Sequence, residues 1–558
     1  MKKSNTLALA VSLLVGAPSA YALTPWTNGK PEITVYTSGG AAQDKAYGQV
    51  VATTLAASGS VDSFSDVDPA TGSVGSRWTA YYFIGNANLG SGLAGKKILL
   101  EKRSYGAAGY GVVPLVANVA LEHLKVIGQP QSDWDTNGTQ QWKKTIDGSN
   151  AGQYLIKKVS DAGFLGVDPD ILLKPGTENY PGQVNELSSG LPEVNWPTTL
   201  KVIPKTGSNP FTVVSTGGLV YGVAVTLDLY KVLQAAQKRA GTLPSSVVIG
   251  SYDEDSLPNL NRNVIASLLA GKIGAWEQIK IIDKTDGNSA KTLLDSTILD
   301  DAGVSEPYKE STTGANLTPV AVGKRNKGAA IGAVAYAKFL NYPGTLKAFP
   351  PAPKTADNAV DEDATLPIVK SPGGAADTGN LLKDWQNGTN ATGYNNVVDG
   401  LSYAKRWGIA INSADRNSSV TADGTGGDPW RYIRIDGYAP TLENVAAGVY
   451  PHWAEGSVIY RTNKAGDAQW VLKTKLLKAF ADDLGSPTVA NAVNTTQAWG
   501  KTGIFATTAD PRGFTASVPF NTSNPVVALT HNNGGSTHAD IVPVANDATT
   551  GGLEIQLK

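Results

Sequence analysis

Short apolar, β-branched runs recur along the chain, and several are followed by a glycine-rich segment and then by a helical pattern. Residues 33–36 alternate and predict a strand, and apolar positions three and four apart predict a helix at about 42–55. The nearly continuous apolar run 219–225 is typical of a strand buried on both faces. Strands that alternate with helices in this way predict an α/β fold with a mainly parallel sheet.

The same patterns predict further elements. They are strands at 97–101 and 318–322, and helices at 226–239, 262–270, 331–340 and 472–484. Asn261 and Thr441 have side chains suited to cap the first turns of short helices. The polar, glycine-rich stretches 57–95 and 128–155 are interpreted as inserted loops, and 343–365 as a surface loop or linker. In the tail, 526–530 and 541–544 are expected to form a hairpin.

The first 22 residues have the form of a secretion signal. Lys2 and Lys3 precede an apolar core at 7–15, and Ala20-Tyr21-Ala22 fits a cleavage site. This core is shorter than the roughly 20 residues that span a membrane, and no later apolar run reaches that length. The mature chain is therefore expected to begin at Leu23, to be exported to the periplasm or beyond the cell, and to have no membrane span.

Composition excludes several classes of function. The 558 residues contain no cysteine, which excludes disulfides, thiol catalysis and cysteine-bound metal. The net charge is −1 and the basic residues are not clustered, so nucleic acid is a poor candidate partner. The chain has only four histidines and neither a HExxH nor a nucleophile-elbow motif. We therefore expect no catalytic residues, cofactor or metal.

Three predicted strands end in glycine-rich loops that lead into helices, at 37–42, 103–113 and 323–331. Such loops present backbone N–H groups to anions, and the helix dipole adds to the attraction. One loop of this kind is usually only a turn. Three in one chain, with Arg325 inside one of them, favour an anion-binding cleft.

Several segments, in the same order, resemble the periplasmic phosphate-binding proteins of ABC importers. The segment 257–276, which ends in Gly-Lys-Ile-Gly-Ala-Trp, matches the family's sequence pattern best among these segments. The others are 35–47, 102–106, 164–170, 322–331 and 432–453. The resemblance covers about 33–500 and implies a two-lobed type II periplasmic binding protein fold with the ligand between the lobes.

The resemblance also implies roles for individual residues. Ser104 would donate a hydrogen bond to a bound oxyanion, Asp168 would accept a proton from it, and Arg325 would make a forked, charge-assisted contact. Backbone N–H groups would come from Gly40, Ala41, Gly328 and Ala329. Residues 1–22 would be the signal, 23–222 and 412–505 the first lobe, 223–411 the second lobe and 506–558 an added tail.

This sequence differs from the family pattern in two of the glycine-rich loops. Gly328-Ala-Ala-Ile331 stands where the family has Gly-Ser-Gly-Thr, and Ala41 stands where it has a hydroxyl side chain. Each missing hydrogen-bond partner of a desolvated anion lowers its binding by roughly 1–3 kcal/mol. We consider three alternative functions. The first is a solute-binding protein that binds phosphate or a related anion weakly, with an ABC permease as its partner. The second is a secreted structural protein that self-assembles through 506–558, and the third is a secreted phosphatase.

Overall fold

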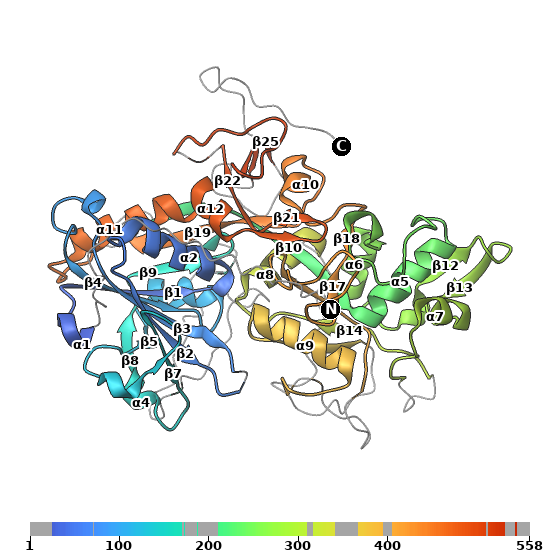
Figure 1. Cartoon of the computed structure of the whole chain (residues 1–558), viewed down its shortest axis with the longest axis horizontal. Helices are drawn as coiled ribbons and strands as arrows, with labels where there is room; N and C mark the ends of the chain where they lie inside the picture. Colours follow the sequence, from blue (N-terminus) through green and yellow to red (C-terminus); the bar gives the residue numbers. More distant parts are fainter. Residues whose placement is uncertain are drawn as a thin grey trace, which may run out of the picture.

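A long mixed sheet runs through the molecule (Figure 1). The computed structural model describes residues 25–70, 72–169, 210–309, 316–340, 367–393, 404–508, 512–530 and 542–543, together with Leu172, Leu187, Ile203, Asn395 and Asp510. In this part of the chain the sheet has 15 strands. Twelve of them follow one hydrogen-bonded order: β15 (Ile368–Lys370), β14 (Ala321–Gly323), β16 (Gly408–Ser413), β10 (Phe211–Thr226), β19 (Trp453–Arg461), β9 (Ala162–Leu165), β1 (Ile33–Gly39), β4 (Lys97–Arg103), β3 (Val74–Ile84), β2 (Asp62–Val67), β7 (Gln141–Thr145) and β6 (Asp135–Thr136).

Three short strands complete this sheet, and five two-stranded sheets lie around it. The short strands are β17 (Trp430–Tyr432), β22 (Ile504–Thr507) and β23 (Val526–Val527). The pairs are β5 (Ala120–Leu124) with β8 (Leu155–Val159), β11 (Asn259–Leu260) with β18 (Arg434–Ile435), β12 (Lys280–Asp283) with β13 (Ser289–Thr292), β20 (Thr495–Gln497) with β21 (Gly500–Thr502), and β24 (Leu529–Thr530) with β25 (Val542–Pro543).

Helices cover the sheet in two halves that β10 connects (Figure 1). The first half, drawn mainly in blue, contains β1, β4 and β9; the second half, drawn mainly in green and yellow, contains β14, with which β15 and β16 pair. The helices are α1 (Pro25–Asn28), α2 (Asp44–Val50), α3 (Val113–Ala117), α4 (Ala151–Tyr154), α5 (Leu227–Arg239), α6 (Arg262–Leu269), α7 (Ser296–Ala302), α8 (Ala330–Phe339), α9 (Ala375–Asn387), α10 (Leu442–Ala446), α11 (Trp470–Leu484) and α12 (Pro487–Val493). None of these described helices has both the length and the apolar character needed to cross a membrane.

Most of the predicted elements are present, and the two predicted caps are confirmed. The side chain of Asn261 accepts a hydrogen bond from the N–H of Val264 at the start of α6, and Thr441 accepts one from Asn444 at the start of α10. The buried central strand is present as β10, which is longer than its apolar run. The predicted pairing of the two tail segments is confirmed where the chain is described, since β24 and β25 pair antiparallel. The predictions for 1–22 and for 343–365 lie outside the described residues.

Three predictions about the sheet and the inserted segments are wrong. The sheet is mixed rather than mainly parallel, because β10 pairs antiparallel with both β16 and β19. The segment 57–95 is not a loop, since it contains β2 and β3, which pair antiparallel. Polar residues hid the alternation of β2: Asp66 points inward, where its carboxylate lies 2.6 Å from Nε of Arg77. The segment 128–155 likewise contains β6, β7 and α4.

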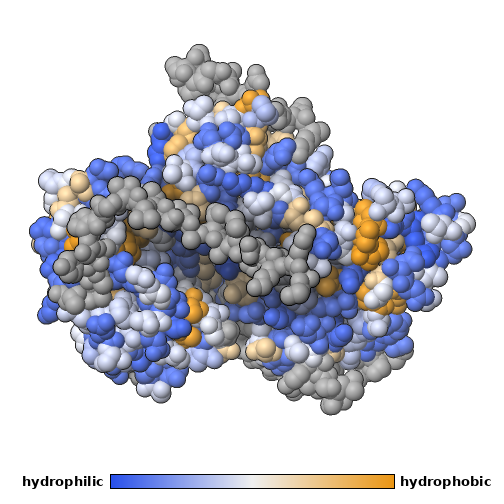
Figure 2. All heavy atoms as spheres, in the orientation of Figure 1, coloured by the Kyte–Doolittle hydropathy of each residue, from blue (hydrophilic) through white to orange (hydrophobic). Residues whose placement is uncertain are grey.

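The apolar side chains are mostly enclosed between the sheet and its helices. On the face drawn in Figure 2 hydrophilic residues dominate, and apolar residues form small separate groups. Among the described residues the large apolar side chains that are exposed are Val74, Val248, Ile282, Val471 and Val518. Scattered apolar residues of this kind are usual on monomeric surfaces.

A buried histidine in the central core predicts a loss of stability in mild acid. His452 is fully buried beside the rings of Tyr221 and Phe339, and both ring nitrogens lack a hydrogen-bond partner among the described residues. Burial, with a smaller contribution from Lys338, lowers the pKa of His452 from 6.5 to about 3. Between pH 6.5 and about pH 3, His452 is therefore protonated in the unfolded chain and neutral in the folded chain. The free energy of unfolding falls as the pH drops below about 6.5.

The expected size is about 2 kcal/mol of unfolding free energy lost between pH 7 and pH 5, at about 1.4 kcal/mol per pH unit. Urea unfolding at the two pH values measures it. His452→Phe keeps a ring of similar size and removes the titrating group, so its loss should be smaller than that of the wild type by this amount. Equal losses in the two proteins would contradict the assignment to His452.

Candidate functional site

The carboxyl ends of two groups of parallel strands face each other near the middle of β10. β4 and β9 pair parallel with β1, and β15 and β16 pair parallel with β14. β10 is antiparallel to β16 and, through β19, parallel to β9. The register places Ser413, the last residue of β16, opposite Tyr221 in β10. Loops beyond such carboxyl ends are where α/β sheets bind their ligands.

Loops from both halves touch at this point. The N–H of Gly109 donates to the carbonyl of Gly328 at 2.8 Å, and the Tyr221 hydroxyl donates to the carbonyl of Gly166 at 2.9 Å. A Cβ atom at Gly166 would lie 3.2 Å from that of Ala330 and 3.3 Å from that of Ala42. The segments that follow β1, β4, β9 and β14 are therefore packed together.

Three of the predicted backbone donors, Gly40, Ala41 and Ala329, lie in these packed segments. Gly40 directly follows β1, and its N–H donates to the carbonyl of Phe164 at 2.9 Å. Ala41 begins a short 3₁₀ turn, Ala41–Gln43, that leads into α2. The N–H of Ala329 donates to the carbonyl of Asn326 at 3.2 Å. Two of the four predicted backbone donors are thus engaged within the chain in this conformation.

The hydroxyl of Ser104 is engaged by a carboxylate of the chain itself. Ser104 directly follows β4, and its hydroxyl lies 3.0 and 2.9 Å from the two carboxylate oxygens of Asp44, the first residue of α2. Lys102 Nζ lies 2.9 Å from Ser104 Oγ and 3.3 Å from Asp44 Oδ1. Burial lowers the pKa of Lys102, and Asp44 opposes this shift. Asp44 therefore contacts the hydroxyl that is predicted to donate to an oxyanion.

Arg325 lies in the loop after β14 and is 8 % exposed. Its Nε donates to the carbonyl of Pro372 at 3.2 Å and its Nη2 to that of Gly373 at 2.8 Å. Both carbonyls belong to the Ser-Pro-Gly-Gly loop that connects β15 with α9. Burial raises the pKa of Asp377, in the first turn of α9, and Arg325 opposes this shift. This loop is not among the three predicted glycine-rich loops, although it repeats their pattern of a strand, glycines and a helix.

Buried cations gather around these strand ends. Lys324 and Lys370 are 8 % and 6 % exposed and lie side by side, because the N–H of Lys324 donates to the carbonyl of Lys370. Lys102 in β4 and Arg325, the neighbour of Lys324 in the chain, are buried as well. Asp168 follows β9 by three residues and is half-buried. Cations with glycine-rich loops favour an anion over a neutral or cationic ligand.

Hydrolytic chemistry finds little support in the described residues. The nearest pair of suitable groups is Ser160 Oγ and His123 Nε2, 3.3 Å apart. Ser160 is 2 % exposed and His123 is fully buried, so a substrate has no access to either in this conformation. Within the described part of the chain no three His, Cys, Asp or Glu side chains are grouped so that they could hold a metal ion.

Comparison with known proteins gives only distant similarity. No family model matches the chain, and no curated protein matches it. A putative phosphate ABC transporter substrate-binding protein with bound phosphate from Clostridium perfringens is 12 % identical over 53 % of this chain and 72 % of its own, with a TM-score of 0.25. An ABC-type phosphate transport receptor from Vibrio cholerae is 12 % identical over 50 % and 71 %, with a TM-score of 0.23.

A third solved structure, of a high-affinity periplasmic phosphate-binding protein (PfluDING) bound with phosphate, is 11 % identical. The match covers 84 % of this chain and 90 % of that one, with a TM-score of 0.33. These similarities are too distant to assign a ligand to this chain.

Proposed function

We propose that this chain is an exported, non-catalytic solute-binding protein that holds phosphate or a related small anion between its two halves. The observation that carries this proposal is the meeting of glycine-rich loops from opposed strand ends around buried cations. The contact between Gly109 and Gly328 joins the two halves at this point. A ligand held there touches both halves, so its binding energy favours the closed arrangement.

Arg325 is the proposed main anion contact. Its guanidinium is held in place by two carbonyl groups of the loop after β15, which fixes its plane before a ligand arrives. A guanidinium so oriented loses little freedom on binding a phosphate group. Ser104 is the proposed hydroxyl donor, and Asp168 the proposed acceptor for a proton of the ligand.

The carboxylate of Asp44 competes with the proposed ligand for Ser104 and Lys102. A phosphate group that takes the hydrogen bond of Ser104 and the charge of Lys102 has to replace the carboxylate that already holds them. The two anions also repel each other. We therefore expect the wild-type protein to bind phosphate more weakly than a site with the same donors and no internal carboxylate.

Arg325→Gln tests this function. Removing one charge-assisted contact is expected to weaken phosphate binding at least about tenfold, since such a bond contributes about 1.5–3 kcal/mol. The measurement is calorimetric titration at neutral pH, on protein that has been unfolded and refolded to remove carried-over ligand. Thermal unfolding of the variant shows whether the fold is kept when the bonds to Pro372 and Gly373 are lost.

Arg262→Gln is the matched control. Arg262 is exposed at the start of α6 and pairs with Asp436, away from the strand ends. Its substitution removes the same charge and should leave the affinity for phosphate unchanged. Equal affinity in the wild type and in Arg325→Gln would remove Arg325 from the proposed site.

A further inference from the structure

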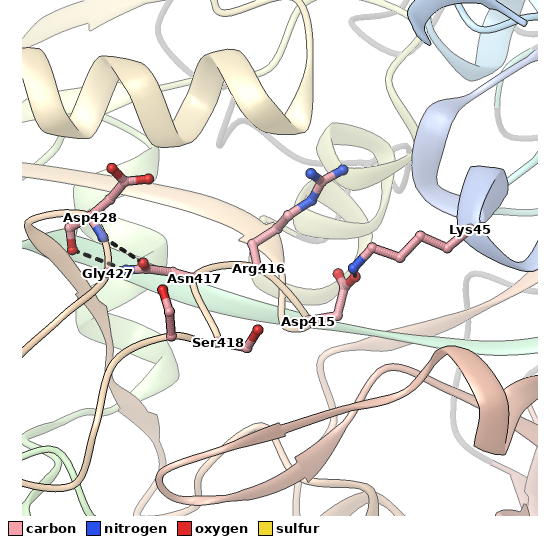
Figure 3. Close-up of a pocket in the computed structure, with 8 residues that line it drawn as sticks. Lys45, Asp415, Arg416, Asn417, Ser418, Gly427 and Asp428 are labelled. Atoms are coloured by element: carbon pink, nitrogen blue, oxygen red, sulfur yellow. Dashed lines mark hydrogen bonds and ion pairs between the residues drawn. The ribbon is translucent and has the colours of Figure 1, made fainter. Parts of the chain in front are cut away.

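A polar pocket lies between α2 and the loop that follows β16 (Figure 3). Its volume is about 420 Å³. The first half contributes only Lys45, and the second half contributes the rest of the lining: Asp415, Arg416, Asn417, Ser418, Ser419, Gly427 and Asp428. Nothing in the proposed site at Arg325 uses these side chains.

One cation of the pocket pairs with no acidic side chain among the described residues. Lys45 Nζ lies 2.7 Å from the carboxylate of Asp415, and Asp428 pairs with Lys383 at 3.2 Å. Arg416, by contrast, makes no side-chain hydrogen bond or ion pair with any residue that the structure describes, and its Nε atom is buried without a partner. Figure 3 shows the guanidinium of Arg416 extending between Asp428 and the Lys45–Asp415 pair. The four charged side chains of the lining sum to zero, and Lys383, which pairs with Asp428 from outside the lining, brings the group to one positive charge.

The loop around Arg416 is held by its own hydrogen bonds. The side-chain oxygen of Asn417 accepts from the N–H of Asp428 at 2.7 Å, and its nitrogen donates to the carbonyls of Asp428 and Trp430. These bonds fix the backbone on both sides of the pocket. Ser418 and Ser419 are exposed on its edge, so their hydroxyls are available as donors.

We propose that this pocket binds a small oxyanion group, a carboxylate or a phosphate, through the guanidinium of Arg416. Both groups match the fork of N–H donors that an arginine presents, and a charge-assisted bond to a partly buried guanidinium is stronger than one in open solvent. The hydroxyls of Ser418 and Ser419 supply neutral donors beside it. The site goes beyond the function proposed above, because it requires neither Arg325 nor Ser104.

Chemical labelling of Arg416 tests this site in the intact, refolded protein. Phenylglyoxal modifies arginine side chains, and peptide mass spectrometry gives the rate at each one. The rates are compared in sodium chloride, sodium phosphate and sodium acetate at equal ionic strength. At an anion concentration that fills four fifths of the sites, modification of Arg416 is expected to be about fivefold slower. Exposed Arg262 serves as the internal reference and should not be slowed.

Each outcome is decisive. Slowing by phosphate and not by acetate supports a phosphate-type ligand, and slowing by both supports a carboxylate-binding site. Unchanged rates in both salts, or equal slowing at Arg262, would overturn the proposal. The same labelling of the Arg325→Gln variant separates the two sites: protection of Arg416 persists there even if the function proposed for Arg325 is wrong.

Discussion

Replacement of Gly163 by alanine is expected to destabilise the protein by at least about 3 kcal/mol, at or beyond the upper range for overpacked sites. Gly163 lies in β9, between β1 and β19. A Cβ atom there would lie 1.7 Å from the carbonyl oxygen of Gly111. The obstacle is backbone rather than a side chain that can rotate away. Either β9 or the loop after β4 has to move, and both belong to the candidate site.

Urea unfolding measures this loss of stability, and Gly152→Ala is the matched control. Gly152 lies in α4, and an added Cβ would meet nothing within 4 Å. In a helix alanine is favoured over glycine by up to about 1 kcal/mol, so this variant should be as stable as the wild type or slightly more stable. A Gly163→Ala protein as stable as the Gly152→Ala protein would show that the close packing around β9 is wrong.

Replacement of Asp44 by asparagine is expected to increase the affinity for phosphate about thirtyfold to a hundredfold. The change removes a negative charge from the first residue of α2 and frees Lys102 and the hydroxyl of Ser104 for an incoming anion. Hydrogen bonds to charged groups contribute about 1.5–3 kcal/mol each, and 1.4 kcal/mol corresponds to a factor of ten. Asparagine keeps the size of the side chain, so the gain arises from charge rather than from space.

Calorimetric titration of the two proteins side by side measures the gain. Asp300→Asn is the control, because Asp300 is exposed on α7 and its loss changes the net charge by the same amount. That control should bind as the wild type does. Weaker binding in Asp44→Asn would mean that Asp44 supports the ligand instead of competing with it. Failure of every variant to bind would contradict the proposed function itself.

The sequence predicted the frame of the site because strands and loops have local patterns. The alternation before Gly40, the apolar run that contains Tyr221 and the cap at Asn261 all depend on neighbouring residues, and each lies where expected. The prediction of a shared cleft rested on the recurrence of three glycine-rich loops between strands and helices. The direct contact between Gly109 and Gly328 agrees with it.

The contacts that determine the chemistry of the site could not be predicted in this way. Asp44 and Ser104 are 60 residues apart, and only the parallel register of β1 and β4 brings them together. The loop after β15 was not predicted because only two consecutive apolar residues, Ile368 and Val369, precede it, too few to indicate a strand. In the sequence, the residues around Arg416 have the composition of an ordinary polar loop. Only the structure shows that the Nε atom of Arg416 is buried without a hydrogen-bond partner among the described residues.

The most direct test of the proposed function is to locate a bound anion in crystals. Arsenate has the shape and charge of phosphate, and its arsenic atom gives an anomalous diffraction signal. In crystals of the Asp44→Asn protein soaked in arsenate, we expect a peak between the loops that follow β4 and β14, in contact with Ser104 and Arg325. Crystals of the same variant that diffract well and show no peak between these loops would contradict the proposal that the two halves hold an anion.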